Sequence, residues 1–166
     1  MPKERIPLRI VEDRLQLIAL ICCPGLRIRY ATISFVIDTG SPASYFSEGD
    51  VKRSQIPLKG KRGTGRVNIG GSGYETIKLP SMEMIMLKEG LKEHFSRKIN
   101  LSALQTTKSS PSQIIVAQSI PSLLGIDFLR EQNSSLFVNV REGIAYLEFD
   151  LNEIVPSSKE VSRLPE

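Results

Sequence analysis

One short segment combines residue types that can do acid–base chemistry. The apolar run 35–37 leads directly into Asp38, and the polar turn 39–41 follows. Burying an ionised carboxylate is costly unless another group neutralises or shares its charge. The function therefore depends on the partner of Asp38. A lone Asp-Thr-Gly also fits an ordinary turn in which the carboxylate accepts hydrogen bonds from nearby backbone amides.

Two later segments contain residues that could support such a site. Three glycines lie within residues 70–73 and interrupt strand-like sequence, which predicts a hairpin with a mobile tip. The apolar segment 123–129 contains Gly125 and Asp127, and a short helix is expected to begin there. Asp127 is the second acidic candidate. A carboxylate at the start of a helix is stabilised by the helix dipole, so we assign Asp127 a structural role.

The elements that position these residues are expected to be mostly strands. Short runs rich in β-branched and aromatic residues alternate with clusters of Gly, Pro and Ser, and no long stretch has helical periodicity. A helical turn is expected at 47–50, and a short helix ends near residue 132. Strands are predicted at 15–21, 26–33, 76–87 and 113–117, with a final hairpin at 136–149.

At 166 residues the chain is long enough to form one domain with its own core. We expect an all-β domain over residues 15–150, preceded by an N-terminal arm at 1–14. Residues 88–111 are polar and without pattern, which predicts an exposed insertion. A polar segment with two prolines, 151–166, is expected to be a disordered tail.

Composition and charge exclude several classes of protein. The net charge is +4, but the basic run 59–66 lies among glycines and lacks aromatic residues. It therefore predicts a solvated loop and no nucleic-acid partner. The apolar run 15–23 is about half as long as a membrane span, and the N-terminus lacks the pattern of a secretory signal. Cys22 and Cys23 are adjacent and point to opposite faces of a strand, which favours buried thiols in a reducing, cytoplasmic compartment. We expect no cofactor, no metal ion and no membrane partner.

Taken in order, these segments resemble the retropepsin-like aspartic proteases, the single-lobe relatives of pepsin. The resemblance spans roughly residues 15–149. Residues 37–41, Ile-Asp-Thr-Gly-Ser, look like the catalytic loop, 68–74 look like the flap tip, and 123–129 look like the second signature of the family. The resemblance implies a closed β-barrel of the acid-protease type, with one short helix near the C-terminus.

The resemblance also implies a role for each site residue. Asp38 would be catalytic, Thr39 would hydrogen-bond across a dimer axis, and Gly40 would bond the substrate backbone. Ser41 either donates a hydrogen bond to Asp38, which would favour the ionised form and activity at lower pH, or is an ordinary turn residue. Tyr74, beside the flap tip, is expected to be a packing residue. The flap residues are Ile69, Gly70, Gly71, Ser72 and Gly73, and the structural second signature includes Leu124 and Gly125.

A homodimer follows from the same resemblance. Two carboxylates about 3 Å apart cannot both ionise, so they share one proton, titrate as a unit and supply both an acid and a base for peptide hydrolysis. The chain has no second Asp-Thr-Gly. The partner is therefore expected to be Asp38 of a twofold-related copy, and the substrate a peptide or protein. A catalytically silent dimerisation or peptide-binding module of the same fold is the alternative.

The sequence departs from viral members of the family near the catalytic loop. Those members carry an acidic residue where this chain has Ala43 or, one position earlier, Pro42, and an Arg where this chain has Ile126. Both partners of that ion pair are absent, consistent with joint replacement by apolar packing. The hairpin 136–149 replaces a single final strand, as in cellular and prokaryotic members.

Overall fold

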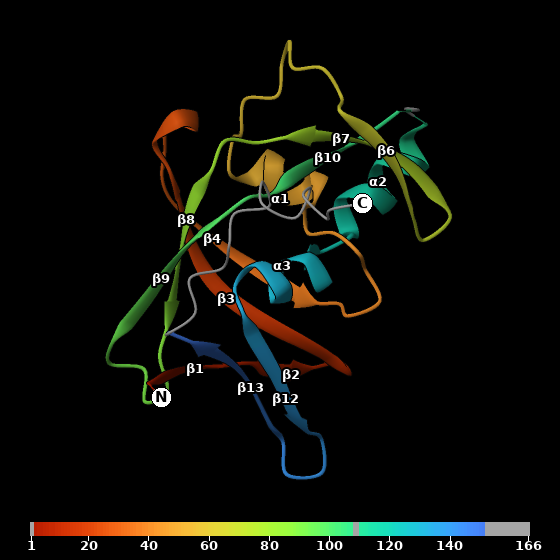
Figure 1. Ribbon diagram of the computed structural model, residues 1–166. Coiled ribbons are helices and arrows are strands. Elements are labelled where there is room, and N and C mark those ends of the chain that lie inside the picture. The colour runs from red at the N-terminus through yellow and green to blue at the C-terminus, as the bar shows by residue number, and fades with distance from the viewer. Residues whose placement is uncertain (1, 108–109, 152–166) are drawn as a thin grey trace, which may run out of the picture.

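The computed structural model describes residues 2–107 and 110–151, and most of these residues lie in two β-sheets (Figure 1). The smaller sheet has the order β1-β13-β12 and is antiparallel throughout. Its strands are β1 (Lys3–Pro7), β12 (Ser134–Asn139) and β13 (Ile144–Asp150). The predicted hairpin at 136–149 is thus confirmed, as β12 and β13.

The larger sheet contains ten strands and the candidate site. Its order is β6-β7-β10-β5-β11-β4-β3-β8-β9, with β2 paired to β3. The strands are β2 (Arg9–Val11), β3 (Arg14–Cys23), β4 (Ile28–Ile37), β5 (Tyr45–Phe46), β6 (Gly65–Ile69), β7 (Ser72–Lys78), β8 (Met82–Leu87), β9 (His94–Ile99), β10 (Ser102–Thr106) and β11 (Ser122–Leu124).

The mainly-β prediction is confirmed, but the expected closed barrel is not found. Within the described residues the larger sheet runs from edge strand β6 to edge strand β9. These two strands lie on opposite sides of the molecule in Figure 1. A barrel closes only when its first and last strands hydrogen-bond to each other, so this sheet stays open.

The helices also differ from the prediction of a single short helix. A 3₁₀ turn, η1 (Pro24–Leu26), joins β3 to β4, and three α-helices follow: α1 (Glu48–Arg53), α2 (Pro111–Ser119) and α3 (Ile126–Glu131). The expected helical turn near 47–50 and the expected helix near 132 correspond to α1 and α3.

Residues 113–117, predicted as a buried strand, belong to α2 instead. The reason is local, because Ser110 and Gln113 form a capping box and Pro111 occupies the first turn. Two side chains of this segment, Ile115 and Val116, are exposed. The cap therefore outweighs the β-branched composition.

Strands also occur in segments that were expected to be irregular. The predicted N-terminal arm contains β1 and β2, and β1 pairs with β13 from Lys3↔Asp150 to Pro7↔Tyr146. The predicted insertion at 88–111 contains β9 and β10. β9 was not predicted because Arg97 lies at an inward-facing position between Phe95 and Ile99 and interrupts the apolar alternation that marks a half-buried strand.

The core lies inside the larger sheet and extends to the smaller one. Leu147 and Phe149 of β13 are fully buried and join the same cluster as residues of β3, β4 and β8. The largest buried members include Leu17, Ile21, Phe35, Met84 and Phe149. The two sheets are therefore parts of one packed unit.

Three other expectations concern the cysteines, the tail and the membrane. Cys22 is half-buried, Cys23 is buried, and both are free thiols. The predicted disordered tail lies outside the described residues except for Leu151. Over residues 2–107 and 110–151, no helix combines the length and the apolar character needed to cross a membrane.

Candidate active site

Asp38 directly follows β4, a long central strand of the larger sheet. β4 runs parallel to β11, with Leu124 opposite Ile37, and the backbone N–H of Asp38 continues this ladder by donating to the carbonyl of Leu124 at 2.9 Å. The loop 38–44 then leads into β5, which pairs antiparallel with β11. The catalytic-loop candidate and the second signature, far apart in the sequence, are thus neighbours in one sheet.

Asp38 is half-buried, and within the described residues its carboxylate accepts one hydrogen bond, from its own turn. Oδ1 accepts a hydrogen bond from the backbone N–H of Gly40 at 3.0 Å, and the carbonyl of Asp38 accepts one from the N–H of Ser41 at 3.1 Å. Thr39 and Gly40 are exposed. A carboxylate has room for about four hydrogen bonds, so Asp38 keeps acceptor capacity for a group from outside this turn.

Gly125 lets the second signature pass directly beneath the loop that carries Asp38. A Cβ atom at this position would lie 2.5 Å from the carbonyl oxygen of Ser41 and 2.7 Å from that of Ala43. The next residue contacts the same loop, because the N–H of Ile126 donates to the carbonyl of Ser41 at 2.9 Å. The close approach therefore depends on the missing side chain.

Asp127 fastens the start of α3 to the same loop. Its Oδ2 accepts from the N–H of Ser44 at 2.9 Å, and its Oδ1 accepts from the Ser44 hydroxyl at 2.6 Å and from the N–H of Phe128 at 2.7 Å. Ser44 Oγ also accepts from the N–H of Gly125 at 2.8 Å. Burial and the negative charge of Asp127 raise the pKa of Tyr45. These contacts agree with the structural role that the sequence suggested for Asp127.

The hydroxyl of Ser41 contacts the backbone of its own loop. It donates to the carbonyl of Ala43 at 2.7 Å, so its single proton is not directed at Asp38. Of the two interpretations of Ser41, the structure favours the turn residue. Ala43 and Ile126 lie on the two segments that meet at this point.

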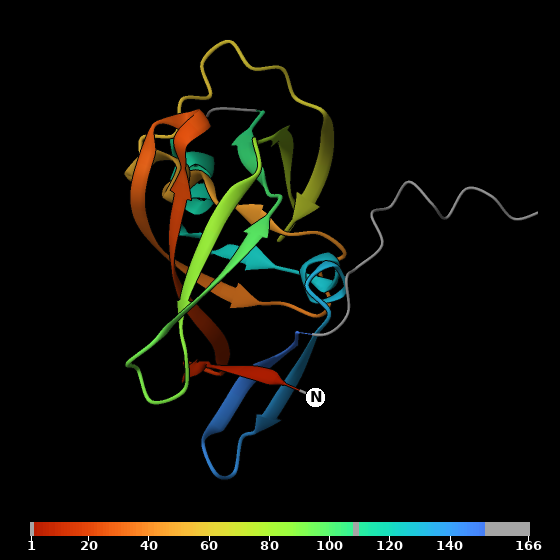
Figure 2. The same cartoon turned by 60° about the vertical axis from the view of Figure 1, so that its left-hand side comes forward.

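The glycine-rich segment forms the predicted hairpin. β6 and β7 pair from Gly65↔Thr76 to Ile69↔Ser72, and Gly70 and Gly71 make the two-residue turn with φ of +58° and +81°. Two positive φ angles in succession favour glycine at both positions. Figures 1 and 2 both show the tip of this hairpin on the same side of the molecule as the loop between β4 and β5.

Tyr74, in β7 of this hairpin, packs into the interior of the protein. It is 1% exposed and belongs to a small cluster with Tyr45, Leu104 and Ala117. Ile69, at the tip, is partly buried against the same cluster. Burial also raises the pKa of Tyr74. The packing role expected for Tyr74 therefore agrees with its position.

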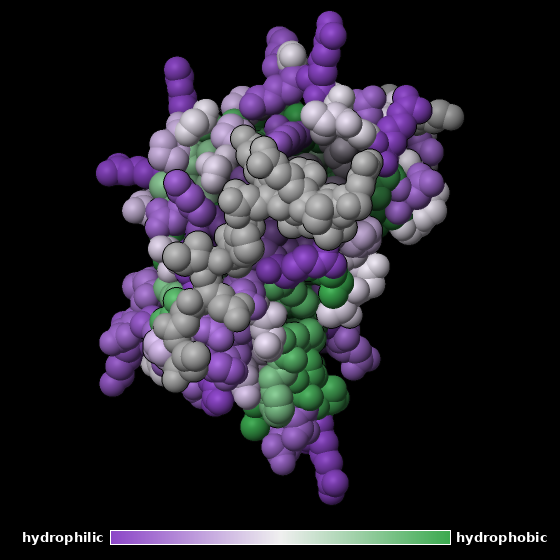
Figure 3. All heavy atoms as spheres, viewed as in Figure 1, coloured by the Kyte–Doolittle hydropathy of each residue, from purple (hydrophilic) through white to green (hydrophobic). Residues whose placement is uncertain are grey.

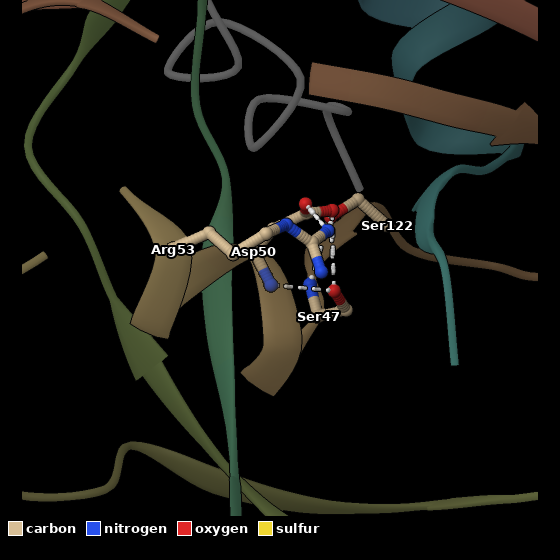
Figure 4. Close-up of polar contacts among 4 residues, drawn as sticks. All are labelled: Ser47, Asp50, Arg53 and Ser122. Atoms are coloured by element: carbon tan, nitrogen blue, oxygen red, sulfur yellow. Dashed lines mark hydrogen bonds and ion pairs between the residues drawn. The ribbon is translucent and has the colours of Figure 1, made fainter. Parts of the chain in front are cut away.

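A buried polar cluster that the sequence analysis missed holds β11 against α1 (Figure 4). Ser122 Oγ donates to Asp50 Oδ2 at 2.5 Å and accepts from the N–H of Ser47 at 2.9 Å. Arg53 pairs with the same carboxylate from the exposed side. Asp50 is buried, and both of its carboxylate oxygens have hydrogen-bond or ion-pair partners, so we assign it a structural role. Ser47 was expected to begin a helical turn, but the links of Ser44 and Ser122 gave no sequence signal because their partners are distant along the chain.

Comparison with known proteins supports the fold. No protein-family model and no curated protein sequence matches the chain. Among solved structures, the chain is similar to a retropepsin-like aspartic protease from Rickettsia conorii, with a TM-score of 0.53 and 13% sequence identity, over 89% of this chain and 91% of that chain. At this identity the likeness shows a retropepsin-like fold, and activity has to be argued from the residues.

Proposed function

We propose that this protein is an aspartic endopeptidase that works as a homodimer, with Asp38 and its twofold-related copy forming the catalytic dyad. The observation that carries the proposal is the state of Asp38. It directly follows β4, a central strand of a retropepsin-like fold, it is half-buried, and within the described residues its carboxylate accepts one hydrogen bond, from its own turn. Two acids on helices next to this site, Asp50 and Asp127, are occupied by several contacts within the chain.

The chemistry needs one ionised and one protonated carboxylate. The ionised group takes a proton from a water molecule, whose oxygen attacks the peptide carbonyl, while the protonated group hydrogen-bonds the carbonyl oxygen. Collapse of the tetrahedral intermediate breaks the C–N bond, and the proton passes to the leaving amine. One copy of this chain supplies one such carboxylate at Asp38, so both roles require two copies.

The hairpin β6–β7 supports a role in holding an extended substrate. A glycine-rich tip can open for substrate entry and close to exclude water. Gly70 and Gly71 would form this tip, while Ile69 and Tyr74 anchor the hairpin to the underlying cluster. A peptide bound in extended form is gripped mainly through its backbone, as in strand addition.

The first test replaces the carboxylate by its amide. Asp38→Asn should lower cleavage of a broad peptide library at mildly acidic pH by at least about 10²-fold, because an amide cannot exchange the proton. Its melting temperature should stay close to that of the unchanged protein. Asp13→Asn, the same change in the turn between β2 and β3, is the matched control and should keep full activity. Cleavage that persists in Asp38→Asn would place the catalytic group elsewhere.

Mixing tests whether the site is shared between copies. An excess of inactive Asp38→Asn protein, added to a fixed amount of active protein, should lower the measured rate as subunits exchange into mixed dimers. A rate that does not change after exchange has been verified would contradict a shared dyad. A folded dimer that cleaves no member of the library would favour the silent binding module instead.

A further inference from the structure

A polar pocket lies at the start of β4, at the opposite end of this strand from Asp38. Its volume is about 360 Å³, and its walls come from residues 27–32 and from residues 53–55 at the end of α1. β4 is ten residues long and a strand rises about 3.3 Å per residue, so roughly 30 Å of strand separates the pocket from Asp38. The pocket is therefore separate from the candidate active site. We call it the arginine pocket, because Arg27, Arg29 and Arg53 line it.

The arginine pocket carries positive charge that the chain does not balance. Within residues 2–107 and 110–151, Arg27 and Arg29 have no ion-pair partner, and no acidic residue lines the pocket. Arg53 differs from them, because it pairs with Asp50 (Figure 4). Two guanidinium charges are thus left for an anion from outside the chain. Arginine stays protonated at any ordinary pH, so these charges are permanent.

An irregularity in β4 directs two neighbouring side chains outwards at this pocket. Between Ile21 and Cys23 the register of β3 against β4 shifts, and the extra residue lies on β4. Arg29 and Tyr30 lie in this stretch, and both are exposed, although neighbours on a regular strand point to opposite faces. A β-bulge re-aims side chains in this way and is common next to functional sites. The backbone therefore presents a charge and an aromatic ring side by side.

Two further lining residues adopt a backbone conformation that favours glycine. Arg27 ends η1 with a φ of +57°, and Gln55 follows α1 with a φ of +54°. Glycine is the usual residue where a helix ends in this conformation. The chain instead places two long side chains there, both with N–H donors, and both line the arginine pocket. The left-handed backbone thus adds hydrogen-bond donors to the wall of the pocket.

The combination of groups selects the chemistry of the ligand. Guanidinium groups bind phosphate oxygens through two parallel hydrogen bonds, and a ligand with two phosphate groups would balance both open charges. Tyr30 is 64% exposed, so its ring is available to stack against a planar ring. The Ser54 hydroxyl and the Gln55 amide can hydrogen-bond the rest of the ligand. A volume of about 360 Å³ lies within the range of small-molecule sites.

The pocket also differs from the basic run 59–66. That run lacks an aromatic residue, which argued against a nucleic-acid partner. Here Tyr30 supplies the ring, and the arginines come from segments on either side of the pocket. Figure 3 shows mainly hydrophilic residues over the upper left of the molecule, where Figure 1 places the orange-red turn η1 that leads into β4. The arginine pocket therefore combines two features that the sequence keeps apart.

We propose that the arginine pocket binds a nucleotide, with the phosphate groups on Arg27 and Arg29 and the base against Tyr30. The size of the pocket favours a free nucleoside diphosphate, and single-stranded nucleic acid offers the same chemistry in a longer ligand. This inference goes beyond the proposed function and does not depend on the Asp38 dyad.

The test measures binding to the full chain by isothermal titration calorimetry, with folding followed by circular dichroism. The probes are adenosine diphosphate, inorganic pyrophosphate and a short oligo-deoxyadenylate. Arg29→Gln should weaken the binding of adenosine diphosphate by at least about tenfold, because a charge-assisted hydrogen bond to phosphate is lost. Arg27→Gln should act in the same direction. Arg141→Gln, the same change in the exposed turn after β12, is the matched control and should leave binding unchanged.

Tyr30→Leu separates a nucleotide from a simple anion. It should weaken adenosine diphosphate and leave pyrophosphate unchanged, because only the nucleotide has a base to stack. An oligo-deoxyadenylate that binds more tightly than adenosine diphosphate, with the same dependence on Arg29 and Tyr30, would support the nucleotide chemistry and identify a strand as its source. Pyrophosphate or an oligo-glutamate peptide that binds as tightly as adenosine diphosphate would overturn the inference. Folded protein that binds no adenosine diphosphate at millimolar concentration would overturn it as well.

Discussion

Asp38 lies in the loop 38–44, and Asp127 lies at the start of the helix that contacts this loop. The two carboxylates nevertheless differ in how many hydrogen bonds they accept. Asp127 accepts three hydrogen bonds from Ser44 and Phe128. Over residues 2–107 and 110–151, the Asp38 carboxylate accepts one, from Gly40 in its own turn. Asp127 therefore uses its acceptor oxygens to fix the loop, whereas Asp38 is positioned by the loop. An acid available for chemistry is recognised here by unused acceptor capacity on a rigid support.

Gly125 lies between the two acids, and its replacement is expected to have the largest effect on the site. Gly125→Ala would place a Cβ atom against two backbone carbonyl oxygens that cannot rotate away. The φ of Gly125 is −94°, so the backbone itself suits alanine and contact is the sole cause. We expect the free energy of unfolding to fall by about 1–3 kcal/mol or more, with loss of activity in the protein that remains folded.

Chemical denaturation and peptide cleavage measured on the same preparations check this expectation. Gly25→Ala is the matched control, since its Cβ would meet Pro80 at an ordinary contact distance of 3.6 Å. Unchanged stability of Gly125→Ala would mean that the second signature does not support the Asp38 loop as closely as described.

Asp127→Asn should distinguish the two acids by their effects on stability. The amide keeps one acceptor oxygen and loses the charge, so bonds to the Ser44 N–H and hydroxyl are weakened. We expect the free energy of unfolding to fall by about 1.5–3 kcal/mol, whereas Asp38→Asn should leave it nearly unchanged. Glu131→Gln, which removes an exposed charge from the same helix, serves as the control. Equal stability losses in Asp38→Asn and Asp127→Asn would remove the distinction between the acids.

Much of the site's local structure could be predicted because its signals are local. The apolar strand before Asp38, the two-glycine turn of the hairpin and the helix that begins beside Asp127 each depend on neighbouring residues. The position of β11 beside β4 was not predicted, because residues 122–124 are too few to specify their own pairing.

Other features depend on partners far along the chain, and these the sequence did not reveal. Ser44 and Asp127 are 83 residues apart, and Ser122 and Asp50 are 72 apart, so no spacing rule links them. The α2 helix was missed for the opposite reason. Its local capping box was present in the sequence, but the β-branched run that follows was given more weight.

Ser41 gives the smallest expected effect, because it lies in the Asp38 turn but its hydroxyl contacts the backbone of the loop. Ser41→Ala removes the 2.7 Å hydrogen bond to the Ala43 carbonyl and should lower the free energy of unfolding by about 0.5–1.5 kcal/mol. The pH dependence of cleavage should stay where it was, because no hydrogen bond from Ser41 stabilises the ionised carboxylate. An acidic limb that moves to higher pH in Ser41→Ala would show that the hydroxyl turns to Asp38 in the working enzyme. If neither limb of the pH profile moves, Ser41 is assigned, like Asp127, to the support of the loop.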